Sequence, residues 1–527
     1  MRRPLLLSGF MATGKSTVAR LVAERTGRPC VDLDARLEAR FGTSIPAFFA
    51  ARGEAAFRAE ERAELERILA TTGSEGAPVV ALGGGALLAR DLRLRALDSA
   101  VVLTLQASPA EIAKRAGSSS GRPLLDAPDP VQRALELLAQ RATVYAEAHA
   151  TLPTDGRRAS QVADAAIAEW RRDAIAVAAA EHSYVVEVGE GLLPRLAEVT
   201  AGASLPVLVS DRNVEPLHGS ATRTALGAPA RRLAELVLTP GEREKHVGSV
   251  EAIWRAALAA GADRKSTFVG LGGGVVTDMT GFAAATYMRG VAWVGVPTTL
   301  LAMVDASVGG KTGVDLEQAK NAVGAFWQPK RVLCDTNLEA TEPARGYTSA
   351  LAEVVKTAII GDPELFTLLE AEQAGVRARR PELVSELVRR SVRVKARIVG
   401  LDERESGLRA LLNLGHTLGH ALEARAGFER LTHGEAVSLG LVAALRVGEA
   451  LGQTPPYLRE RVQALLGALG LPTDLTREPL AEAAELVTLD KKRAGSQVRF
   501  VVARELGRVE TLDLELGKLK TLAQSLR

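Results

Sequence analysis

Short apolar runs and longer helical stretches alternate along roughly the first 170 residues of the chain. The apolar runs are PLLLSGF, PVVALGGG and AVVLTLQ, and stretches such as EERAELERILA and PVQRALELLAQRATVYAEAHA separate them. A short apolar run between turn residues predicts a buried strand, whereas apolar positions three or four residues apart predict an amphipathic helix. Regular alternation of the two predicts a parallel sheet that is covered by helices.

A second region repeats this pattern and a third abandons it. The runs SYVVEVGEG, LPVLVSD, AELVLTP and STFVGLGGG again alternate with helical stretches, and the joint before them, ASQVADAAIAEWRRDAIAVAAAEH, is predicted to be helical. From about residue 341, amphipathic helices such as PELVSELVRRSVRVKARIVG and GEAVSLGLVAALRVGEALG dominate, with one late strand-like run, QVRFVVAREL. Because 527 residues exceed one hydrophobic core of about 250 to 300 residues, we predict three domains, at residues 1–172, 173–340 and 341–527.

Composition narrows the class of protein. Hydrophobic residues make up 47% and charged residues 24%, and 66 Lys+Arg against 63 Asp+Glu leave a net charge of only +3. This balance argues against nucleic acid as a partner, although a local basic pocket for a small anion stays open. No run approaches the roughly 20 apolar residues of a membrane span, and we interpret the opening MRRPLLLSGF as a first strand. The two cysteines, Cys30 and Cys334, suggest neither a disulfide framework nor a zinc site, so we expect a cytoplasmic protein.

The segment GFMATGKST, residues 9–17, follows an apolar strand and precedes a helix. It satisfies the phosphate-binding pattern G-x-x-x-x-G-K-[ST] in the context that the pattern needs. The glycines let backbone N–H groups surround phosphates, Lys15 neutralises the transferred group, and Ser16 offers a hydroxyl to Mg²⁺. A chance match in a tight turn is the alternative, and the strand-loop-helix context disfavours it.

Polar residues after this loop narrow the acceptor. Asp32 and Asp34 follow a strand and Arg58 lies on the next helix; helix capping and solvation would explain each of them without a ligand. Together with GGG at residues 83–85, GRPLL at residues 121–125 and Arg141, however, they form a set that resembles shikimate kinase. The resemblance covers about residues 1–172. An arginine pair suits a carboxylate substrate, and an ionised aspartate suits a polyol.

The resemblance implies a role for each position of this first domain. ATP would contact Ala12, Thr13, Gly14, Lys15, Ser16, Thr17 and the lid residue Arg122; shikimate would contact Asp34, Arg58, Gly83, Gly84, Gly85 and Arg141; Mg²⁺ would be held by Ser16 and Asp32. Ala12 stands where the family usually has a third loop glycine. Gluconate kinase and nucleotide kinase are the alternatives, and the two arginines favour a carboxylate acceptor.

The second domain holds a different glycine-rich turn. GLGGGVVTD runs from a strand into a helix that carries Asp278, a pattern that by itself fits tight packing as well as a dinucleotide. The segment that follows has Lys311 and Lys320 among apolar residues, near Asp305 and Asn321. Lysines in such surroundings need a partner. An anionic substrate is the simplest partner, and Arg289 could join them.

The third domain concentrates potential metal ligands. Glu353 lies three residues before Lys356 on an apolar helix, where a plain ion pair is the simpler interpretation. His416, His420 and His433 follow in NLGHTLGHALEARAGFERLTHGE. Spacing alone favours His416 and His420 as a ligand pair, since residues four apart share one helix face.

At this point residues from about 180 to 527 resemble 3-dehydroquinate synthase. The shared motifs are PGEREK, GGGVVTDMTGFAAATYMRG, VPTTLLAMVDASVGGKTGVD, KNAVGAFWQP, ALAEVVK, NLGHTLGHALE, HGEAV and DKK. The implied NAD-binding residues are Asp211, Glu242, Lys245, Gly273, Gly274, Val275, Val276, Thr277, Asp278, Thr298, Thr299, Lys311, Lys320, Leu338 and Thr341. The implied ligands of Zn²⁺ or Co²⁺ are Glu353, His416 and His433. The implied residues for the phosphorylated substrate are Arg289, Asp305, Lys311, Asn321, Lys356, Arg409, His420, Lys491 and Lys492.

The two resemblances imply a fused enzyme of the shikimate pathway. A P-loop kinase domain would phosphorylate shikimate with ATP and Mg²⁺. A Rossmann-like domain and a mainly helical metal-binding domain would convert 3-deoxy-D-arabino-heptulosonate 7-phosphate to 3-dehydroquinate and phosphate with NAD⁺ and a divalent metal. The residues expected to act in catalysis are Lys15, Asp34, Lys311, Lys356, Arg409 and His420. A homodimer through the synthase part is also expected.

Some alternatives and departures stay open. The second half could be a related sugar-phosphate cyclase or a polyol dehydrogenase, and one half could bind without reacting. Thr277 replaces a usual glycine, which touches the predicted cofactor loop. Gly346 stands where the family commonly has glutamate, and the sequence offers no interpretation of that change.

Overall fold

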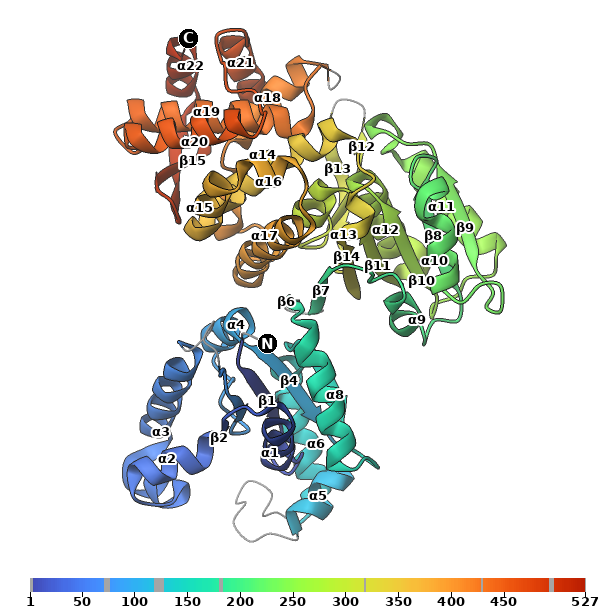
Figure 1. Cartoon of the computed structure of the whole chain (residues 1–527), viewed down its shortest axis with the longest axis vertical. Helices are drawn as coiled ribbons and strands as arrows, with labels where there is room; N and C mark the ends of the chain where they lie inside the picture. Colours follow the sequence, from blue (N-terminus) through green and yellow to red (C-terminus); the bar gives the residue numbers. More distant parts are fainter. Residues whose placement is uncertain are drawn as a thin grey trace. The chain divides into compact units, whose positions relative to one another are not determined.

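The computed structural model describes residues 3–70, 76–117, 128–179, 183–316, 319–427, 430–491 and 497–526. These residues form two compact units, Met1–Val185 and Val186–Arg527, coloured blue to teal and green to red in Figure 1. The sequence prediction divided the second unit again at residue 340, and that division stays a prediction. Among the described helices, none has both the length and the apolar character that crossing a membrane requires.

The first unit is the predicted parallel sheet between helices. Its strands take the order β2-β3-β1-β4-β5, and every pair is parallel. The strands are β1 (Leu5–Gly9), β2 (Cys30–Asp32), β3 (Val79–Ala81), β4 (Val101–Gln106) and β5 (Ala150–Pro153). The helices are α1 (Lys15–Thr26), α2 (Leu33–Phe41), α3 (Ile45–Leu69), α4 (Arg90–Ser99), α5 (Pro109–Gly117), α6 (Pro130–Gln140), α7 (Ala142–Ala146) and α8 (Ala159–Arg172).

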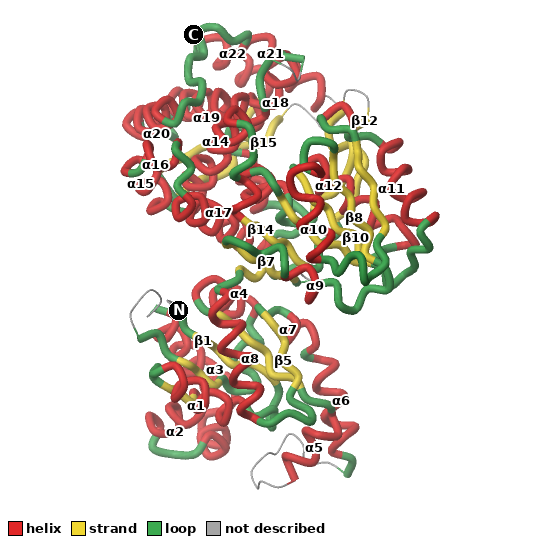
Figure 2. The backbone as a smooth tube through the Cα atoms, turned by 45° about the vertical axis from the view of Figure 1, so that its right-hand side comes forward, coloured by secondary structure: helices red, strands yellow, loops and turns green. Residues whose placement is uncertain are grey.

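Alternate residues of the strands feed two cores. Leu5 and Leu7 pack with α1 and α8 on one face, while Leu6 and Val80 pack with α2, α3 and α4 on the other. Side chains of successive strand residues point to opposite faces, so a strand that is apolar throughout belongs between two layers of helices. Figure 2 shows the strands in yellow between helices in red.

The helix predicted for the joint is shorter than expected. α8 ends at Arg172 because Asp173 adopts a left-handed conformation (φ 49°), and β6 (Ile175–Val177) follows where helix was predicted. The β-branched residues Ile175 and Val177 are buried. Their tertiary packing outweighs the helix propensity of the alanines around them.

The second unit begins with another sheet, whose pairs from β14 to β9 are parallel, as predicted. The order of its strands is β7-β14-β11-β10-β8-β9, with helices on both faces. The elements of this part are β7 (Tyr184–Gly189), α9 (Arg195–Val199), β8 (Pro206–Asp211), η2 (Glu215–Gly219), α10 (Ser220–Ala225), β9 (Ala234–Leu238), η3 (Glu242–Glu244), α11 (Val247–Ala259), β10 (Thr267–Gly272), α12 (Gly274–Thr286), η4 (Tyr287–Arg289), β11 (Ala292–Pro297), η5 (Ala302–Ala306) and β14 (Arg331–Asp335). An antiparallel hairpin of β12 (Lys311–Leu316) and β13 (Ala319–Phe326), which the sequence did not predict, precedes β14.

The remainder is mainly helical, as predicted. Its helices are α13 (Thr336–Glu339), α14 (Ala344–Gly361), α15 (Pro363–Ala371), α16 (Gln373–Arg377), α17 (Pro381–Leu401), η6 (Leu408–Asn413), α18 (His416–Arg425), α19 (His433–Ala450), α20 (Pro456–Ala468), α21 (Leu480–Lys491) and α22 (Leu516–Ser525). The late apolar run forms β15 (Gln497–Glu505), which pairs with β16 (Arg508–Glu515). α19 packs closely against both α14 and α18, and this packing determines where the predicted metal ligands lie.

Candidate functional site

The predicted phosphate-binding loop connects β1 to α1. Lys15 is the first residue of α1, and its Nζ donates to the carbonyl oxygens of Gly9 (2.9 Å) and Phe10 (2.8 Å). The loop therefore curls around its own lysine, and the first N–H groups of the helix are in place to meet an anion. Ala12 sits in the left-handed region (φ 62°), which explains why a glycine is common at this position. Ser16 and Thr17 are exposed on the first turn.

The residues predicted to bind shikimate converge beside this loop. A Cβ atom placed on Gly83 would lie 2.7 Å from Oδ1 of Asp34, and one placed on Gly85 would lie 2.7 Å from both terminal nitrogens of Arg58. A side chain at either position would push these carboxylate and guanidinium groups aside. The carbonyl oxygen of Gly84 accepts a hydrogen bond at 3.4 Å from Arg141, so this side chain also reaches the cluster.

On the acceptor side of this cluster, a carboxyl group of raised pKa lies near a paired arginine. Burial, reinforced by the charge of Asp32, raises the pKa of the Asp34 carboxyl above its ordinary value. Arg58 forms ion pairs with Glu61 (2.7 Å) and Glu54 (3.1 Å). A half-buried acid of raised pKa beside an arginine is suited to accept a hydroxyl proton and hold a carboxylate.

The sequence missed other residues of this site. Glu61 is buried beside Arg58, Tyr145 donates to Gly84 (2.8 Å), and Arg115 donates to the carbonyl oxygen of Ala12 (3.4 Å). Glu61 had a sequence signal, since it lies one turn after Arg58; the other two contacts are made across the fold. Asp32 caps α2 by accepting from the N–H of Ala35, as the simpler interpretation held. The predicted lid residue, Arg122, lies outside the described residues.

In the second unit, the glycine-rich turn leads from β10 into the N-terminus of α12, where Gly273 caps the helix. Thr277 is buried, and its hydroxyl donates back to the carbonyl oxygens of Gly274 (3.0 Å) and Gly273 (3.3 Å). The departure from glycine is therefore absorbed within the helix itself. Nearby, the hydroxyl of Thr298 is buried and has no hydrogen-bond partner among the described residues. A buried polar atom without a partner is what a bound cofactor would satisfy.

A buried ion pair lies beside this turn. Nζ of Lys245 is 2.6 Å from Oδ2 of Asp278 and 2.5 Å from Oδ1 of Asn321. Burial raises the pKa of the Asp278 carboxyl to about 6, although Lys245 opposes the shift. Lys320 lies 3.7 Å from Glu242, so four of the predicted cofactor residues and one predicted substrate residue are brought together.

The other predicted cofactor residues lie at strand or helix ends. Asp211 ends β8 and accepts from the N–H groups of Asn213 and Val214. Leu338 is buried in α13, and Thr341 meets Nε2 of His218 at 2.8 Å. His218 is a further residue that sequence reasoning missed.

The predicted metal ligands meet where three helices cross. Glu353 lies in the middle of α14, while His416 and His433 are the first residues of α18 and α19. Oε1 of Glu353 is 3.3 Å from Nε2 of His416 and 3.5 Å from Nε2 of His433. Gly434 makes this possible, because a Cβ there would lie 1.8 Å from the carbonyl oxygen of Ser349 on α14.

The buried charges of this cluster set the protonation of Glu353 and of the two histidines differently. Burial alone would raise the pKa of the Glu353 carboxyl, but Lys356, 2.5 Å away, holds it well below its ordinary value. Burial, with help from Lys356, lowers the pKa of His416 to about 3, so this ring is a neutral donor at pH 7. Burial would also lower the pKa of His433, yet the carboxylates of Glu353 and Glu423 outweigh it and raise that pKa to about 9. Both oxygens of Glu353 are buried, one beside Lys356 and the other between the two imidazole rings.

His420 lies one turn further along α18, as its spacing predicted. Its ring centroid is 4.9 Å from that of His416, and nitrogen atoms of the three histidines all lie within 4.8 Å of one another. Of the three histidines, however, His416 and His433 are the ones that form ion-pair contacts with Glu353 among the described residues. His420 is also the exposed member of the trio.

Several predicted substrate residues surround this cluster. Lys356 and Arg409 are 2% exposed, and Arg409 donates to the carbonyl oxygen of Gly309 (3.1 Å). Lys311 pairs with Glu405. Asp305 pairs with Lys395 at 2.6 Å.

The remaining predicted substrate residues are not brought into this group. Arg289 is exposed in a left-handed conformation (φ 68°), and no hydrogen bond or ion pair joins it to another described residue. Lys491 ends α21 but its side chain is not described, and Lys492 lies outside the described residues.

The structure adds polar residues to this site that sequence reasoning did not select: Asn413, Lys395, Glu405 and Glu423. Lys395 is 7% exposed, and Asn413 donates to Glu405 at 3.0 Å. Glu423 contacts Nδ1 of His433. Glu423 stands within the quoted histidine segment, three residues after His420, so the helical period could have placed it on the same face.

Comparisons with known proteins agree with the two sites. A family model described as shikimate kinase matches residues 11–171. Models described as the N-terminal and C-terminal parts of 3-dehydroquinate synthase match residues 235–349 and 350–493.

Relatives of the second unit are close. A 3-dehydroquinate synthase from Halorhodospira halophila is 46% identical over 329 residues, which are 62% of this chain and 92% of the relative. Another, from Nostoc punctiforme, is 43% identical over 339 residues, 63% of this chain and 93% of the relative. Among solved structures, a 2-epi-5-epi-valiolone synthase from Streptomyces hygroscopicus with NAD⁺ and Zn²⁺ bound is 28% identical, with a TM-score of 0.61 over 66% of this chain and 97% of that one. The chain therefore belongs to the 3-dehydroquinate synthase family and carries a shikimate kinase domain ahead of the synthase part.

Proposed function

We propose that the chain is a bifunctional enzyme of aromatic biosynthesis. Its first unit transfers the γ-phosphoryl group of ATP to shikimate, and its second unit converts 3-deoxy-D-arabino-heptulosonate 7-phosphate to 3-dehydroquinate and phosphate. The observation that carries the second activity is the convergence of Glu353, His416 and His433 from three helices beside buried cations. The loop around Lys15 with its neighbouring cluster of Asp34 and Arg58 supports the first.

In the kinase site, the residues act by positioning the two substrates and by neutralising charge. The N–H groups at the start of α1 and Lys15 hold the phosphates, with Ser16 and Asp32 on the side of Mg²⁺. Arg58 and Arg141 hold the carboxylate of the acceptor. Asp34, with its raised pKa, accepts the proton of the attacking hydroxyl as the new P–O bond forms and the bond to ADP breaks. No covalent intermediate on the protein is needed.

A divalent metal fits the three-helix cluster. Two imidazoles and one carboxylate form the donor set of catalytic zinc sites, which leaves positions for substrate oxygens. We assign Glu353, His416 and His433 as its ligands. When bound, the cation polarises a substrate hydroxyl and stabilises the negative charge that develops on its oxygen. His420, one turn away and exposed, faces the substrate instead and can move a proton.

NAD⁺ fits the N-terminus of α12. Gly273 and Gly274 leave room for the pyrophosphate at the helix N-terminus, and Thr298 offers its unpartnered hydroxyl. When bound, the cofactor takes up and returns the hydride that makes elimination of phosphate possible. Lys245 and Asp278 brace this loop through their buried ion pair. Lys311, Lys356 and Arg409 hold the anionic groups of the substrate.

Two alternatives keep the same residues. A related cyclase would use this cofactor loop and metal cluster on another sugar phosphate, and a polyol dehydrogenase would release NADH. Three further parts of the proposal are a cytoplasmic location, in keeping with the free cysteines Cys30 and Cys334, a homodimer through the synthase part, and the domain boundary near residue 340.

An assay of the intact protein with each substrate tests the proposal. We expect ADP from ATP and shikimate, and phosphate from the heptulosonate substrate without net NADH. A strong chelator followed by gel filtration should abolish phosphate release, and Zn²⁺ or Co²⁺ should restore it. Net NADH would favour a dehydrogenase, and a product other than 3-dehydroquinate would favour another cyclase.

Two histidine variants test the ligand assignment. His420→Ala should keep the bound metal and lose turnover, because His420 faces the substrate. His433→Ala should lose both metal and turnover. Metal content by mass spectrometry of the purified variants distinguishes these results, and loss of metal in His420→Ala would mean that spacing, not the contact with Glu353, identifies the ligands.

A further inference from the structure

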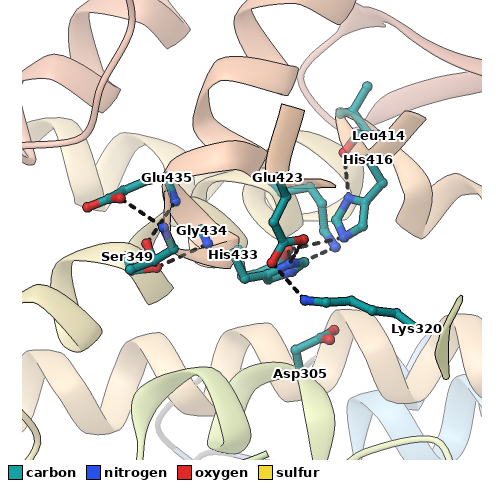
Figure 3. A network of polar contacts seen from close by, with 12 residues as sticks. Asp305, Lys320, Ser349, Leu414, His416, Glu423, His433, Gly434 and Glu435 are labelled. Atoms are coloured by element: carbon teal, nitrogen blue, oxygen red, sulfur yellow. Dashed lines mark hydrogen bonds and ion pairs between the residues drawn. The ribbon is translucent and has the colours of Figure 1, made fainter. Parts of the chain in front are cut away.

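Both histidines that face Glu353 are held on their other side by a second acceptor (Figure 3). Their Nε2 atoms lie 3.3 and 3.5 Å from the same oxygen of Glu353. Nδ1 of His416 lies 3.2 Å from the carbonyl oxygen of Leu414, and Nδ1 of His433 lies 3.5 Å from Oε2 of Glu423. Each ring thus turns Nε2 towards the assigned metal position and Nδ1 towards an outer acceptor, the arrangement that fixes the tautomer of a metal-binding histidine.

The two outer acceptors differ in kind. Leu414 contributes a backbone oxygen just before α18, where Gly415 caps the helix, so its position follows from the helix itself. Glu423 contributes a side chain, and it is only 4% exposed. A buried carboxylate is costly unless it is matched by donors. The buried position of Glu423 therefore depends on donors that neutralise its carboxylate, one of which is His433.

The second partner of Glu423 comes from a different part of the unit. Its Oε1 atom lies 2.9 Å from Nζ of Lys320 on β13, and Figure 3 shows the carboxylate between this lysine and His433. Lys320 in turn lies 3.7 Å from Glu242 in η3. The contacts therefore run from a metal ligand at the start of α19, through α18, to the hairpin and loop assigned to the cofactor.

We propose that Glu423 is a positioning residue with two tasks: it orients His433 for the metal, and through Lys320 it couples metal binding to NAD⁺ binding. One oxygen accepts the Nδ1–H group of His433, which leaves Nε2 as the donor to the cation. The other oxygen fixes Lys320 against the cofactor loop. Because coupling between two ligands is reciprocal, a metal that settles Glu423 changes the affinity for NAD⁺, and NAD⁺ changes the affinity for the metal by the same factor.

This inference rests on the assigned ligand set, and the first test measures metal affinity directly. The metal-stripped full-length protein is titrated with Co²⁺ or Zn²⁺ in competition with a chromophoric chelator. Glu423→Gln should weaken binding by roughly 10- to 100-fold, the usual effect of losing the acceptor behind a histidine ligand. Glu435→Gln is the matched control: it neutralises a carboxylate two residues after His433 that pairs with Arg345 and accepts from the N–H of Thr432. Its metal affinity should stay within about threefold.

The second test measures the coupling. The dissociation constant of NAD⁺ is determined by calorimetry with and without saturating Zn²⁺, for the wild type, Glu423→Gln and Lys320→Met. In the wild type, the metal should change the constant by about fivefold or more. In both variants this change should vanish, whereas Lys320→Met should keep its metal affinity within about threefold. If Glu423 had a purely structural role, Glu423→Gln would weaken both metal and NAD⁺ binding. The factor by which Zn²⁺ changes the dissociation constant of NAD⁺ would then stay as in the wild type.

The outcomes separate this inference from the proposed function. If His433→Ala binds metal as the wild type does, the ligand assignment itself is wrong. If His433→Ala loses the metal but Glu423→Gln keeps wild-type affinity, only the role of Glu423 is overturned. Coupling that persists in Lys320→Met overturns the second task, and so does a wild type without coupling. Should Glu423→Gln fail to fold, as circular dichroism would reveal, the result for Lys320→Met still decides the coupling.

Discussion

The two candidate sites of the chain differ in how they treat charge. In the kinase site, Arg58 is 33% exposed and balances two glutamates, and the close contacts to the substrate cluster come from the glycines 83–85. In the synthase site, Glu353 and Lys356 are 1% and 2% exposed and depend on each other and on the histidines. Removing one charge from a partly hydrated site costs little folding stability. Removing one charge from a buried cluster leaves the partner charges uncompensated, which costs more. Damage to the first should therefore stay local to activity, and damage to the second should also alter ligand content and stability.

The largest expected effect is the selective loss of one activity in each of two variants, which would show that the two sites work independently. Lys15→Ala should lower phosphorylation of shikimate by roughly 10²- to 10³-fold or more, because it removes the charge that stabilises the transferred group. Phosphate release from the heptulosonate substrate should be unchanged. His433→Ala should do the reverse, since the metal is lost. Both rates are measured on the same preparations with coupled assays for ADP and for phosphate.

The same pair of variants contains its own control. Each variant serves as the folding control for the other, because the retained activity reports an intact unit. Loss of both activities in either variant would contradict two separate sites.

A smaller effect tests the close approach of the Gly83 backbone to the acidic side chains of the acceptor cluster in the kinase. Gly83→Ala would bring a methyl group to 2.7 Å from Oδ1 of Asp34 and 2.8 Å from Oε1 of Glu61, so the acceptor cluster must shift. Displacement of this order should raise KM for shikimate or lower kcat by roughly 10- to 100-fold. KM for ATP should change little. Gly117→Ala, where a Cβ meets nothing within 4 Å, is the matched control; equal kinetics for the two variants would remove the case for close approach.

The sequence predicted the structure best where the residues of a site are consecutive along the chain. The loop around Lys15, the strand before it and the helix after it follow from local pattern, and the structure forms them as predicted. The i,i+4 relation of His416 and His420 on one helix was also correct. Periodicity could not decide between His420 and His433, because that choice depends on which ring faces Glu353 from α14. The resemblance to a family, not the spacing, supplied that choice.

The residues that reasoning missed share a physical origin. Lys395 and Glu405 are ordinary charged residues of a helix and a turn, and only the fold brings them against Asp305 and Lys311. The alanine-rich joint was predicted to be helix throughout, yet α8 ends at Arg172 and the buried residues Ile175 and Val177 lie in the strand β6. Such contacts are long-range, so no window of the sequence contains both partners.

A moderate effect concerns a buried acid of the second unit. Glu342 accepts the N–H of Leu300 at 2.8 Å, and a Cβ on Gly346 would lie 2.7 Å from its other oxygen. This carboxylate therefore fills the space beside Gly346, where the family commonly has glutamate. Burial raises the pKa of the Glu342 carboxyl from 4.5 to about 7, despite the hydrogen bond from Leu300.

The sign of the pH dependence follows from this shift. Between pH 4.5 and about 7 the folded protein binds the proton of Glu342 more tightly than the unfolded chain does, so stability falls as pH rises through that window. Glu342→Gln keeps an acceptor for Leu300 without the charge. At pH 8 it should be more stable than the wild type by about 1 to 2 kcal/mol, and near pH 4.5 the two should coincide. Thermal unfolding across this range checks it; a constant difference at all pH values would assign the effect to packing.

The smallest expected effect is on the stability of the kinase unit. There, backbone conformation matters more than buried charge, in contrast to the synthase site. Ala12 holds a left-handed conformation (φ 62°) that costs a residue with a Cβ roughly 1 kcal/mol. Ala12→Gly removes that cost but gives the unfolded chain more freedom, worth about 0.5 to 1 kcal/mol in the opposite direction. The kinase unfolding transition, identified as the one that ATP raises, should therefore move by less than about 1 kcal/mol. The affinity for ATP should not fall, because the N–H groups of the loop keep their positions. A large loss of stability would mean that the methyl group of Ala12 packs against the loop and that the alanine compensates its own strain.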